Sequence, residues 1–307
     1  MRILVTGGAG FIGSHIVDAY LRLGHTVSII DNLSSGREKF INPAAHFYKA
    51  DISDPAAVAD IFKREQPEAL NHHAAQMEVR RSVSDPKFDA QVNILGLLNL
   101  METGKNYGLK KIIFASSGGA IYGDADILPT PENYPVRPAS PYGISKFTCE
   151  LYLDFYAQTY KLPFVALRYG NVYGPRQNPH GEAGVVAIFT RKLLAGETPV
   201  INGDGEQARD FVFVTDVVNA NVRALERTAK LQVNIGTSQK TTVNTIFHEL
   251  VKLTGSMVGE THGPVKPGEQ RVSVLKTELA KLKLNWTPQV TLTEGLARTV
   301  EYFKNEN

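Results

Sequence analysis

Residues 5–15 read VTGGAGFIGSH and join a short apolar run to the start of a helical pattern. Gly7, Gly10 and Gly13 recur every three residues along this stretch. In a strand–turn–helix unit, the first glycine allows a tight turn, the second lets the backbone approach a pyrophosphate, and the third lets the helix pack on the sheet. The helix N-terminus then offers N–H donors to phosphate oxygens. A glycine-rich stretch can equally be a structural turn, so its surroundings decide between the two interpretations.

The first half of the chain alternates between short apolar runs and helical patterns. The runs are almost continuously apolar, which is typical of strands buried on both faces of a parallel sheet. We expect strands at 2–6, 26–30, 45–50, 68–74, 110–116 and 163–169, with helices at 11–23, 55–65, 84–106 and 141–160. This alternation predicts an α/β fold, a doubly wound parallel sheet of the Rossmann type.

The pattern changes after about residue 175, where a polar, turn-rich stretch begins. We expect a dinucleotide-binding domain over 1–175, to which some later segments return, and a smaller C-terminal α/β substrate lobe over 176–307. The loop 122–140 is too long to be a simple connection and is expected to line a site. Within the smaller lobe, the sequence predicts a helix at 183–195, a short strand at 199–202, and strand-and-helix segments at 231–254 and 271–303.

An acidic residue closes the second expected strand. Asp31 stands in the position where a carboxylate accepts the ribose hydroxyls of adenosine and repels a 2′-phosphate, which favours NAD over NADP. Arg37 and Lys39 follow nearby and could instead meet a phosphate. After the third strand, Asp51 and Ile52 could hold the adenine edge, although Asp51 is as well placed to cap the next helix. With a strand before it, a helix after it and this acid, the glycine-rich turn predicts a dinucleotide site.

Composition excludes several classes of function. Among 307 residues, 33 Lys and Arg balance 31 Asp and Glu, so the charge gives no sign of nucleic acid or a membrane surface as a partner. The lone Cys149 allows no internal disulfide, and the histidines show no zinc-type spacing, so we expect no metal. The chain begins directly on an expected strand without a signal-peptide pattern, and no apolar run is long enough to span a membrane. A reduced, cytoplasmic setting is therefore expected.

The stretch PYGISK at 141–146 places a tyrosine and a lysine on one helical face. Tyr142 and Lys146 are four residues apart, and Ser140 followed by Pro141 is a typical helix start. Pairs of this kind usually mark only a solvated surface. Beside a dinucleotide site, however, the same pair can act as a proton-transfer group and its activator.

With these motifs together, the sequence resembles the short-chain dehydrogenase/reductase superfamily in its extended, nucleotide-sugar-acting branch. Within that branch it is most similar to UDP-glucose (UDP-galactose) 4-epimerases, and the resemblance covers nearly the whole chain. Besides the glycine turn and YGISK, it rests on DNLSSG at 31–36, HAAQ at 73–76, Asn93, SSGGAIYG at 116–123, RYGNVYGPRQ at 168–177 and NGDGEQARDFVFVTDV at 202–217.

The resemblance implies an NAD-dependent inversion at C4 of a UDP-hexose through a transient 4-keto sugar. Tyr142 would move the proton of the sugar 4-hydroxyl, and Lys146 with the positive nicotinamide ring would favour the phenolate. Ser117 would orient the sugar oxygen, with Ser116 beside it. A 4,6-dehydratase would need an Asp–Glu pair after this serine, but Gly118, Gly119 and Ala120 stand there and carry no titratable group. The alternatives are another nucleotide-sugar oxidoreductase or epimerase, and a non-catalytic NAD-binding regulator.

The resemblance also implies which residues line the two binding sites. Those expected to contact NAD are Gly7, Gly10, Phe11, Ile12, Gly13, Asp31, Asn32, Ser35, Gly36, Asp51, Ile52, His73, Ala74, Ala75, Gln76, Asn93, Ser116, Tyr142, Lys146 and Tyr169. Those expected to contact the UDP-sugar are Ser117, Asn171, Val185, Val186, Arg209, Lys266, Arg271 and Ser273. Either Lys266 or Arg271 would supply the second cation for the diphosphate, and a guanidinium suits phosphate oxygens well.

Two finer expectations follow from the resemblance. Ser273 stands where some epimerases carry a bulky tyrosine near the C2 substituent of the sugar, so we expect room for an N-acetyl group and turnover of UDP-GlcNAc beside UDP-glucose. The helices expected at 84–106 and 141–160 would pair with those of a second copy, which implies a homodimer with a four-helix interface. Their apolar stripes are equally compatible with packing on the sheet alone.

Overall fold

A seven-stranded parallel sheet forms the centre of the molecule, which a computed structural model describes for residues 1–180, 184–266 and 270–306. Neighbouring strands pair in parallel throughout the sheet. Across the sheet the order is β3 (His46–Lys49), β2 (Thr26–Asp31), β1 (Arg2–Thr6), β4 (Ala69–His72), β5 (Lys111–Ser117), β6 (Phe164–Tyr169) and β11 (Leu231–Ile235). The strand order reverses between β1 and β4. Doubly wound sheets bind their ligands at this point, beyond the carboxyl ends of the strands, and this region is here called the crevice.

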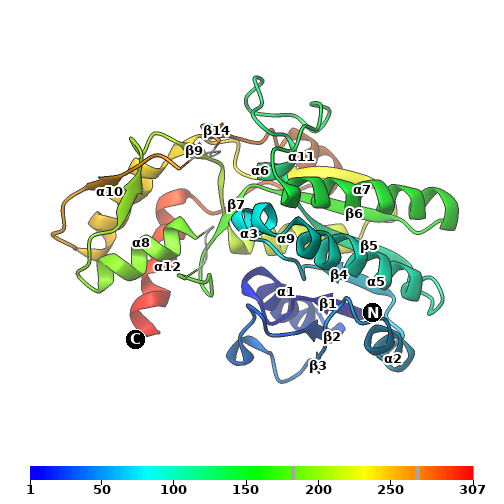
Figure 1. Ribbon diagram of the computed structural model, residues 1–307. Helices are drawn as coiled ribbons and strands as arrows, with labels where there is room; N and C mark the ends of the chain where they lie inside the picture. The colour runs from blue at the N-terminus through cyan, green and yellow to red at the C-terminus, as the bar shows by residue number, and fades with distance from the viewer. Residues whose placement is uncertain (181–183, 267–269, 307) are drawn as a thin grey trace.

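Helices cover both faces of this sheet, as the sequence predicts, and each face has its own hydrophobic core (Figure 1). On one face lie α1 (Phe11–Arg22), α9 (Val214–Leu225) and α11 (Glu278–Leu284). On the other face lie α2 (Pro55–Glu65), α5 (Gly96–Gly104) and α7 (Pro141–Tyr160). Because both faces are buried, the strands are almost continuously apolar, and the predicted α/β Rossmann fold is confirmed.

Local capping fixes the ends of the helices that border the crevice. The Ser140 side chain accepts a hydrogen bond from the Gly143 N–H at 3.2 Å, and Pro141 occupies the first turn of α7. That helix ends at Tyr160, before Lys161 with a φ of 57°. The cap of α2 is Asp54, which accepts from two backbone N–H groups. Asp51 therefore does not cap this helix, because it lies outside the first turn.

The helix expected as one piece at 84–106 is instead divided. A short α3 (Val79–Ser84) precedes Pro86, where α4 (Pro86–Ala90) begins. A π-helical turn, η2 (Gln91–Leu95), then connects α4 to α5. Asp85 caps α4, and a proline in the first turn cannot continue a preceding helix, so the break precedes Pro86. The sequence pattern could not reveal the π turn, because a single wider turn hardly alters the spacing of apolar residues.

The later part of the chain forms a third core beside the sheet. It is built by α8 (Val185–Leu194), α10 (Val243–Thr254) and α12 (Leu292–Asn305), drawn on the left of Figure 1. Three small sheets accompany these helices. They pair β7 (Asn171–Tyr173) with β10 (Phe211–Phe213), β8 (Val200–Asn202) with β13 (Thr261–Gly263), and β9 (Ala208–Arg209) with β12 (Thr241–Thr242) and β14 (Val272–Ser273).

Segments from the later half also join the large sheet, among them the strand at the start of 231–254, which was expected in the smaller lobe. Strand β11 pairs with β6, and α9 packs against α1. The division of the chain at residue 175 stays a prediction. The expected start of helix 183–195 lies outside the described residues, and α8 runs from Val185. Across the described part of the chain, no helix has both the length and the apolar character of a membrane span.

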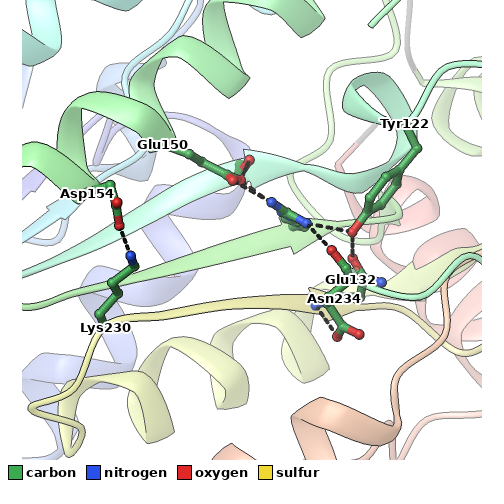
Figure 2. A network of polar contacts seen from close by, with 8 residues as sticks. Tyr122, Glu132, Glu150, Asp154, Lys230 and Asn234 are labelled. Carbon is green, nitrogen blue, oxygen red and sulfur yellow. Dashed lines mark hydrogen bonds and ion pairs between the residues drawn. The ribbon is translucent and has the colours of Figure 1, made fainter. Parts of the chain in front are cut away.

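A buried ion pair ties α7 to β6 and to the loop 122–140. Arg168 donates to both carboxylate oxygens of Glu150, at 3.0 Å from Nε and 2.6 Å from Nη2. The same guanidinium donates to the Tyr122 hydroxyl at 2.8 Å, which in turn donates to Asn234 (Figure 2). The side chains of Arg168 and Glu150 are only 6% and 1% exposed. Glu132, also in this loop, accepts from the backbone N–H of Asn234, so the network anchors the loop.

We expect Glu150→Gln to lower the free energy of unfolding by about 3–5 kcal/mol, because it leaves the Arg168 guanidinium buried without a counter-charge. The matched control lies one turn further along α7, where Asp154 pairs with Lys230 in a more exposed setting (Figure 2). Asp154→Asn should cost only about 0–1 kcal/mol. Urea denaturation of both variants measures the difference, and equal losses would contradict the importance of the buried pair.

Candidate active site

The glycine-rich turn between β1 and α1 brings two backbone segments into contact. A Cβ atom at Gly13 would lie 2.1 Å from the Gly7 carbonyl oxygen, so a side chain there cannot be accommodated without moving the backbone. Gly7 has a φ of +70°, and a Cβ on it would lie 2.7 Å from the Ala74 nitrogen at the end of β4. Helix α1 begins at Phe11, directly after this turn. Its first N–H groups therefore face the crevice where the strand order reverses.

Asp31 lies at the carboxyl end of β2, beside this turn. Its carboxylate accepts hydrogen bonds from the Ala9 N–H at 3.0 Å and the Leu33 N–H at 2.8 Å. The Gly36 backbone lies close against the same carboxylate, because a Cβ there would be 2.8 Å from Oδ1. Burial raises the pKa of Asp31, and the two backbone hydrogen bonds oppose that rise. Each carboxylate oxygen retains further acceptor capacity for a ligand hydroxyl.

The neighbouring polar residues have defined partners. Asn32 donates to Asp51 at 2.8 Å, so these two side chains meet beyond Asp31. Asp51 also accepts from Ser53, and Ile52 is buried against Gly96. The ammonium of Lys39, which could have met a phosphate, instead pairs with Glu306 after α12. Arg37 remains beside the turn together with Asp31, because its backbone N–H donates to the Ala9 carbonyl at 3.0 Å.

Tyr142, Lys146 and Ser117 converge at the crevice from α7 and β5. A hydrogen bond with Ser117 lowers the pKa of Tyr142, but burial outweighs it and raises that pKa to about 12. Lys146 is 4% exposed and donates to the Ala115 carbonyl at 2.9 Å. Burial lowers the pKa of Lys146 to about 8. Ser116 turns the other way and donates to Glu150 at 2.6 Å, so the strand alternation separates the two serines.

His73 and Tyr169 lie at the ends of β4 and β6 and stack on one another. Their ring centroids are 5.9 Å apart, and the Tyr169 hydroxyl lies 3.1 Å from His73 Nε2. Burial and the nearby Lys146 charge lower the pKa of His73 to about 3, so the imidazole is neutral. The backbone N–H groups of His73 and Ala74 both donate to Thr6, which fixes the chain where Ala75 continues along the crevice.

The polar atoms of Gln76 and Asn93 are used within the protein. Asn93 Nδ2 donates to the Gln76 carbonyl at 3.0 Å, and Asn93 Oδ1 accepts from the Gln76 N–H at 3.0 Å. The Gln76 amide binds both backbone groups of Glu78 in a similar way. These two side chains therefore hold the segment after β4 against the π turn. Their contact with NAD stays a prediction.

Several residues expected to contact the sugar come together near Gly119. A Cβ at Gly119 would lie 3.8 Å from Asn171 Oδ1 and 4.0 Å from Ser273 Oγ. Arg209 stands directly beside Ser273, because β9 and β14 pair Ser273 with Arg209. Val185 is the first residue of α8, and Val186 is buried in the third core. The loop 122–140 borders this region through a bridge between Thr130 and Leu275.

The two candidates for the second cation differ in their surroundings. Both guanidinium Nη atoms of Arg271 donate to Asp204, at 2.7 and 2.8 Å, in an exposed ion pair. Lys266 is exposed. Their assignment to the diphosphate stays a prediction. Across residues 1–180, 184–266 and 270–306, no group of three His, Cys, Asp or Glu side chains is arranged to hold a metal ion.

Sequence reasoning overlooked two buried acids close to the convergent residues. Glu150 lies four residues after Lys146 and eight after Tyr142, so all three share one face of α7, and this spacing could have revealed it. Asp89 is fully buried and receives a 2.6 Å hydrogen bond from Ser145. The single helix expected at 84–106 gave no indication that Asp89 points inward.

The chain is similar over its whole length to known proteins. The model of the NAD-dependent epimerase/dehydratase family matches residues 3–236. A putative UDP-glucose 4-epimerase of Methanocaldococcus jannaschii is 46% identical, with 99% of each chain covered. The crystal structure of Thermotoga maritima UDP-glucose 4-epimerase with UDP-glucose superposes with a TM-score of 0.98 at 50% identity, covering 100% of this chain and 99% of that one.

A second solved structure, Thermus thermophilus UDP-glucose 4-epimerase in complex with NAD, has a TM-score of 0.96 at 42% identity, with both chains covered in full. These similarities extend through the glycine-rich turn, the residues that converge on Tyr142, and the later segments beside Ser273. The matched family model spans well over half of the sequence. The chain therefore belongs to the NAD-dependent epimerase/dehydratase family.

Proposed function

We propose that this protein is an NAD-dependent epimerase that inverts C4 of a UDP-hexose. The observation that carries the proposal is the convergence of Ser117, Tyr142 and Lys146 beside the glycine-rich turn, with Gly118 and Gly119 after the serine. The glycines carry no acid or base for an elimination. The relatives named above as UDP-glucose 4-epimerases cover the whole chain and support the same reaction.

The residues at the turn fit NAD. The close approach of Gly13 to Gly7 leaves backbone N–H groups of α1 facing the crevice, as a diphosphate requires. Asp31 is placed for the adenosine ribose, and a carboxylate there disfavours the 2′-phosphate of NADP. Ser116 is an exception among the residues expected at this site, because it faces Glu150, and we infer that the others line the same crevice. When bound, NAD would accept the C4 hydride and return it, so no cofactor is consumed.

Tyr142 would accept the proton of the sugar 4-hydroxyl and give it back. With the pKa of its phenol at about 12, Tyr142 must be activated to act near neutral pH. The Lys146 ammonium, one turn further along α7, is the cation of this chain placed to favour the phenolate. Ser117 would hold the reacting oxygen in line with the phenol, since it already bonds to Tyr142.

The UDP-sugar would extend from this pair toward β9, β14 and α8. Asn171 and Ser273 face the sugar side at Gly119, and Arg209 lies beside Ser273 for the diphosphate. Val185 and Val186 begin the helix expected to cradle the uracil. With only a small hydroxyl at Ser273, the site has room for a C2 N-acetyl group, so we infer that UDP-GlcNAc is also accepted.

We further propose that the protein is a homodimer that works in the cytoplasm. Helix α7 exposes an apolar stripe formed by Ile144, Leu151, Tyr152 and Phe155, which are 38–56% exposed. Leu95 on the neighbouring η2, 49% exposed, and Val83 on α3, 63% exposed, continue it. A monomer rarely leaves such a surface uncovered. A second copy that apposes the same helices would bury it as a four-helix interface.

Incubation with UDP-glucose should yield UDP-galactose without net formation of NADH. Tyr142→Phe should lower the turnover number by roughly 10²–10⁴, the usual contribution of a positioned acid–base group. Tyr160→Phe, at the exposed end of the same helix, is the matched control and should leave it unchanged. Stoichiometric NADH would instead indicate a net oxidoreductase, and full activity in Tyr142→Phe would exclude this pair from the chemistry.

Ser273→Tyr should lower turnover of UDP-GlcNAc while it preserves turnover of UDP-glucose, because the larger side chain fills the space for the C2 substituent. We expect the ratio of the two kcat/KM values to change by roughly tenfold or more. Separation of the product sugars by chromatography measures both reactions. If the unsubstituted enzyme does not convert UDP-GlcNAc at all, the inferred C2 pocket is wrong.

A charge in the exposed stripe of α7 should dissociate the dimer. Leu151→Lys places an ammonium in the centre of the proposed interface, whereas Leu282→Lys, on the exposed face of α11, serves as the control. Sedimentation equilibrium should show a monomer for the first variant and a dimer for the second and for the natural chain. A monomeric natural chain would refute the proposed interface.

A further inference from the structure

A fully buried carboxylate lies next to the helix that carries Tyr142 and Lys146. Asp89, on α4, has an exposed fraction of 0%. Its Oδ2 accepts from the Ser145 hydroxyl at 2.6 Å, and its Oδ1 accepts from the side-chain amides of Gln76 and Asn93, each at 3.1 Å. The three donors belong to α7, to the segment after β4, and to the π turn η2. One carboxylate thus joins the three segments that border the crevice.

The set of contacts matches the ionised form of Asp89. The two amide NH₂ groups can only donate, and a carboxylate can only accept. The Ser145 hydroxyl completes the set as a third donor. Among the described residues, no lysine or arginine forms an ion pair with Asp89. A buried charge without such a pair is costly, so its presence here calls for a role beyond packing.

Lys146 is a buried positive charge, and its burial is costly for the same reason. Its ammonium is buried and its hydrogen bond goes to a neutral carbonyl, that of Ala115. Burial lowers the pKa of Lys146 to about 8, while the charges of Cys149 and Asp89 act to raise it. Burial also raises the pKa of the Cys149 thiol to about 12, so that group is neutral near pH 7. Asp89 is then the negative charge that offsets the burial of Lys146.

The other titratable groups around Lys146 do not supply a negative charge that offsets its burial. His72 and His73, at the end of β4, have pKa values lowered by burial and by Lys146 itself, so both are neutral. Glu150, on the same face of α7, is bound on both oxygens by Arg168. Tyr142 is hydrogen-bonded to Ser117, the last residue of β5, and retains its proton until it is activated. The carboxylate of Asp89 therefore acts on Lys146 without a competing partner among these groups.

We propose that Asp89 is a positioning residue for the Tyr142–Lys146 pair, which keeps Lys146 in its ammonium form and holds the first turns of α7 against the crevice through Ser145. This role rests on the proposed function, because it assumes that Tyr142 and Lys146 perform the proton transfer. The three hydrogen bonds that Asp89 accepts in the described part of the chain all come from protein side chains. Its effect reaches the reaction through the charge of Lys146 and the placement of Ser145, which lies between the two reacting side chains in the sequence.

The sign of the effect follows from the charges. Loss of a negative charge destabilises the ammonium, so the pKa of Lys146 must fall when Asp89 becomes neutral. The pKa of Tyr142 must fall as well, because Asp89 also raises it. If catalysis needs the ammonium, kcat relative to the natural enzyme then begins to decline at a lower pH. A purely structural contribution of Asp89 would change stability and the level of activity. It would leave unchanged the pH at which this decline begins.

The test is Asp89→Asn in the full-length enzyme with NAD and UDP-glucose. Asparagine has the same shape and can still accept from Gln76 and Asn93. For a fall of about one unit from about 8 in the pKa of Lys146, the ammonium fraction relative to the natural enzyme should be about three quarters at pH 6.5 and about one fifth at pH 8. The fall in the pKa of Tyr142 multiplies kcat by the same factor at both pH values, so the relative kcat should be about fourfold lower at pH 8 than at pH 6.5. Asp89→Glu restores the negative charge and should restore the pH dependence of kcat toward that of the natural enzyme.

A second measurement is independent of activity. In protein labelled with ¹³C-lysine, the Lys146 signal, assigned by its loss in Lys146→Met, should titrate about one pH unit lower in Asp89→Asn. Asp216→Asn is the matched control: Asp216 is also buried, but accepts from the backbone of Gln289 and Val290 and should leave both midpoints in place. Should Asp89→Asn not fold, Asp89→Ser retains a neutral acceptor and makes the same test.

The outcomes separate this inference from the proposed function. Unmoved midpoints in the kinetic and NMR titrations of the uncharged Asp89 variant would overturn the role of Asp89, whatever the reaction is. If instead Tyr142→Phe and Lys146→Met retain epimerase activity, the proposed site fails, even though the NMR midpoint of Lys146 still shifts in Asp89→Asn. A shift in both titrations, with Asp216→Asn unchanged, supports the inference.

Discussion

The contact between Gly13 and the Gly7 carbonyl is the constraint on which the arrangement of the site depends. Helix α1 can begin this close to β1 only because no side chain separates the two backbones, since a Cβ at Gly13 would lie 2.1 Å from that oxygen. The close approach directs the N-terminus of α1 toward the point where the strand order reverses. The ends of β2, β4 and β5 then meet around the same crevice and bring Asp31, His73 and Ser117 to it.

Helix α7 is the second element that this arrangement needs, and buried polar contacts add to the packing of Leu153 and Tyr156 in the core to define its position. On one side, Glu150 is fixed by Arg168 and Ser116, which ties the helix to the sheet and to the loop 122–140. On the other side, Ser145 is fixed by Asp89. Tyr142 and Lys146 lie between these two anchors. Buried polar networks in which every member is satisfied make a single geometry favourable, which suits a site that must align a phenol with a sugar hydroxyl.

Much of the fold was predictable because its signals are local. Continuous apolar runs indicate strands covered on both faces, and the capping pair Ser140–Pro141 places the start of α7 correctly. The π turn at 91–95 was not predicted, because the apolar spacing changes too little across one widened turn. The break before Pro86 was overlooked, although a proline is a signal that the sequence itself carries. The convergence of Asn171, Ser273 and Arg209 could be expected only from the family resemblance. These residues are far apart in the sequence, and their approach depends on the pairing of β9 with β14.

The sequence alone determined the fold class, the turn that suits NAD, and the pair Tyr142–Lys146, because each of these depends on the spacing of neighbouring residues along one strand, turn or helix. The family resemblance implied Ser117 as the serine beside the tyrosine, and the tertiary structure supplies the physical reason; only the tertiary structure decided which acid faces Ser145. Ser116 and Ser117 are adjacent and chemically identical, and strand alternation sends one to Glu150 and the other to Tyr142. Asp89 and Ser145 are 56 residues apart, so their hydrogen bond exists only because α4 and α7 pack together.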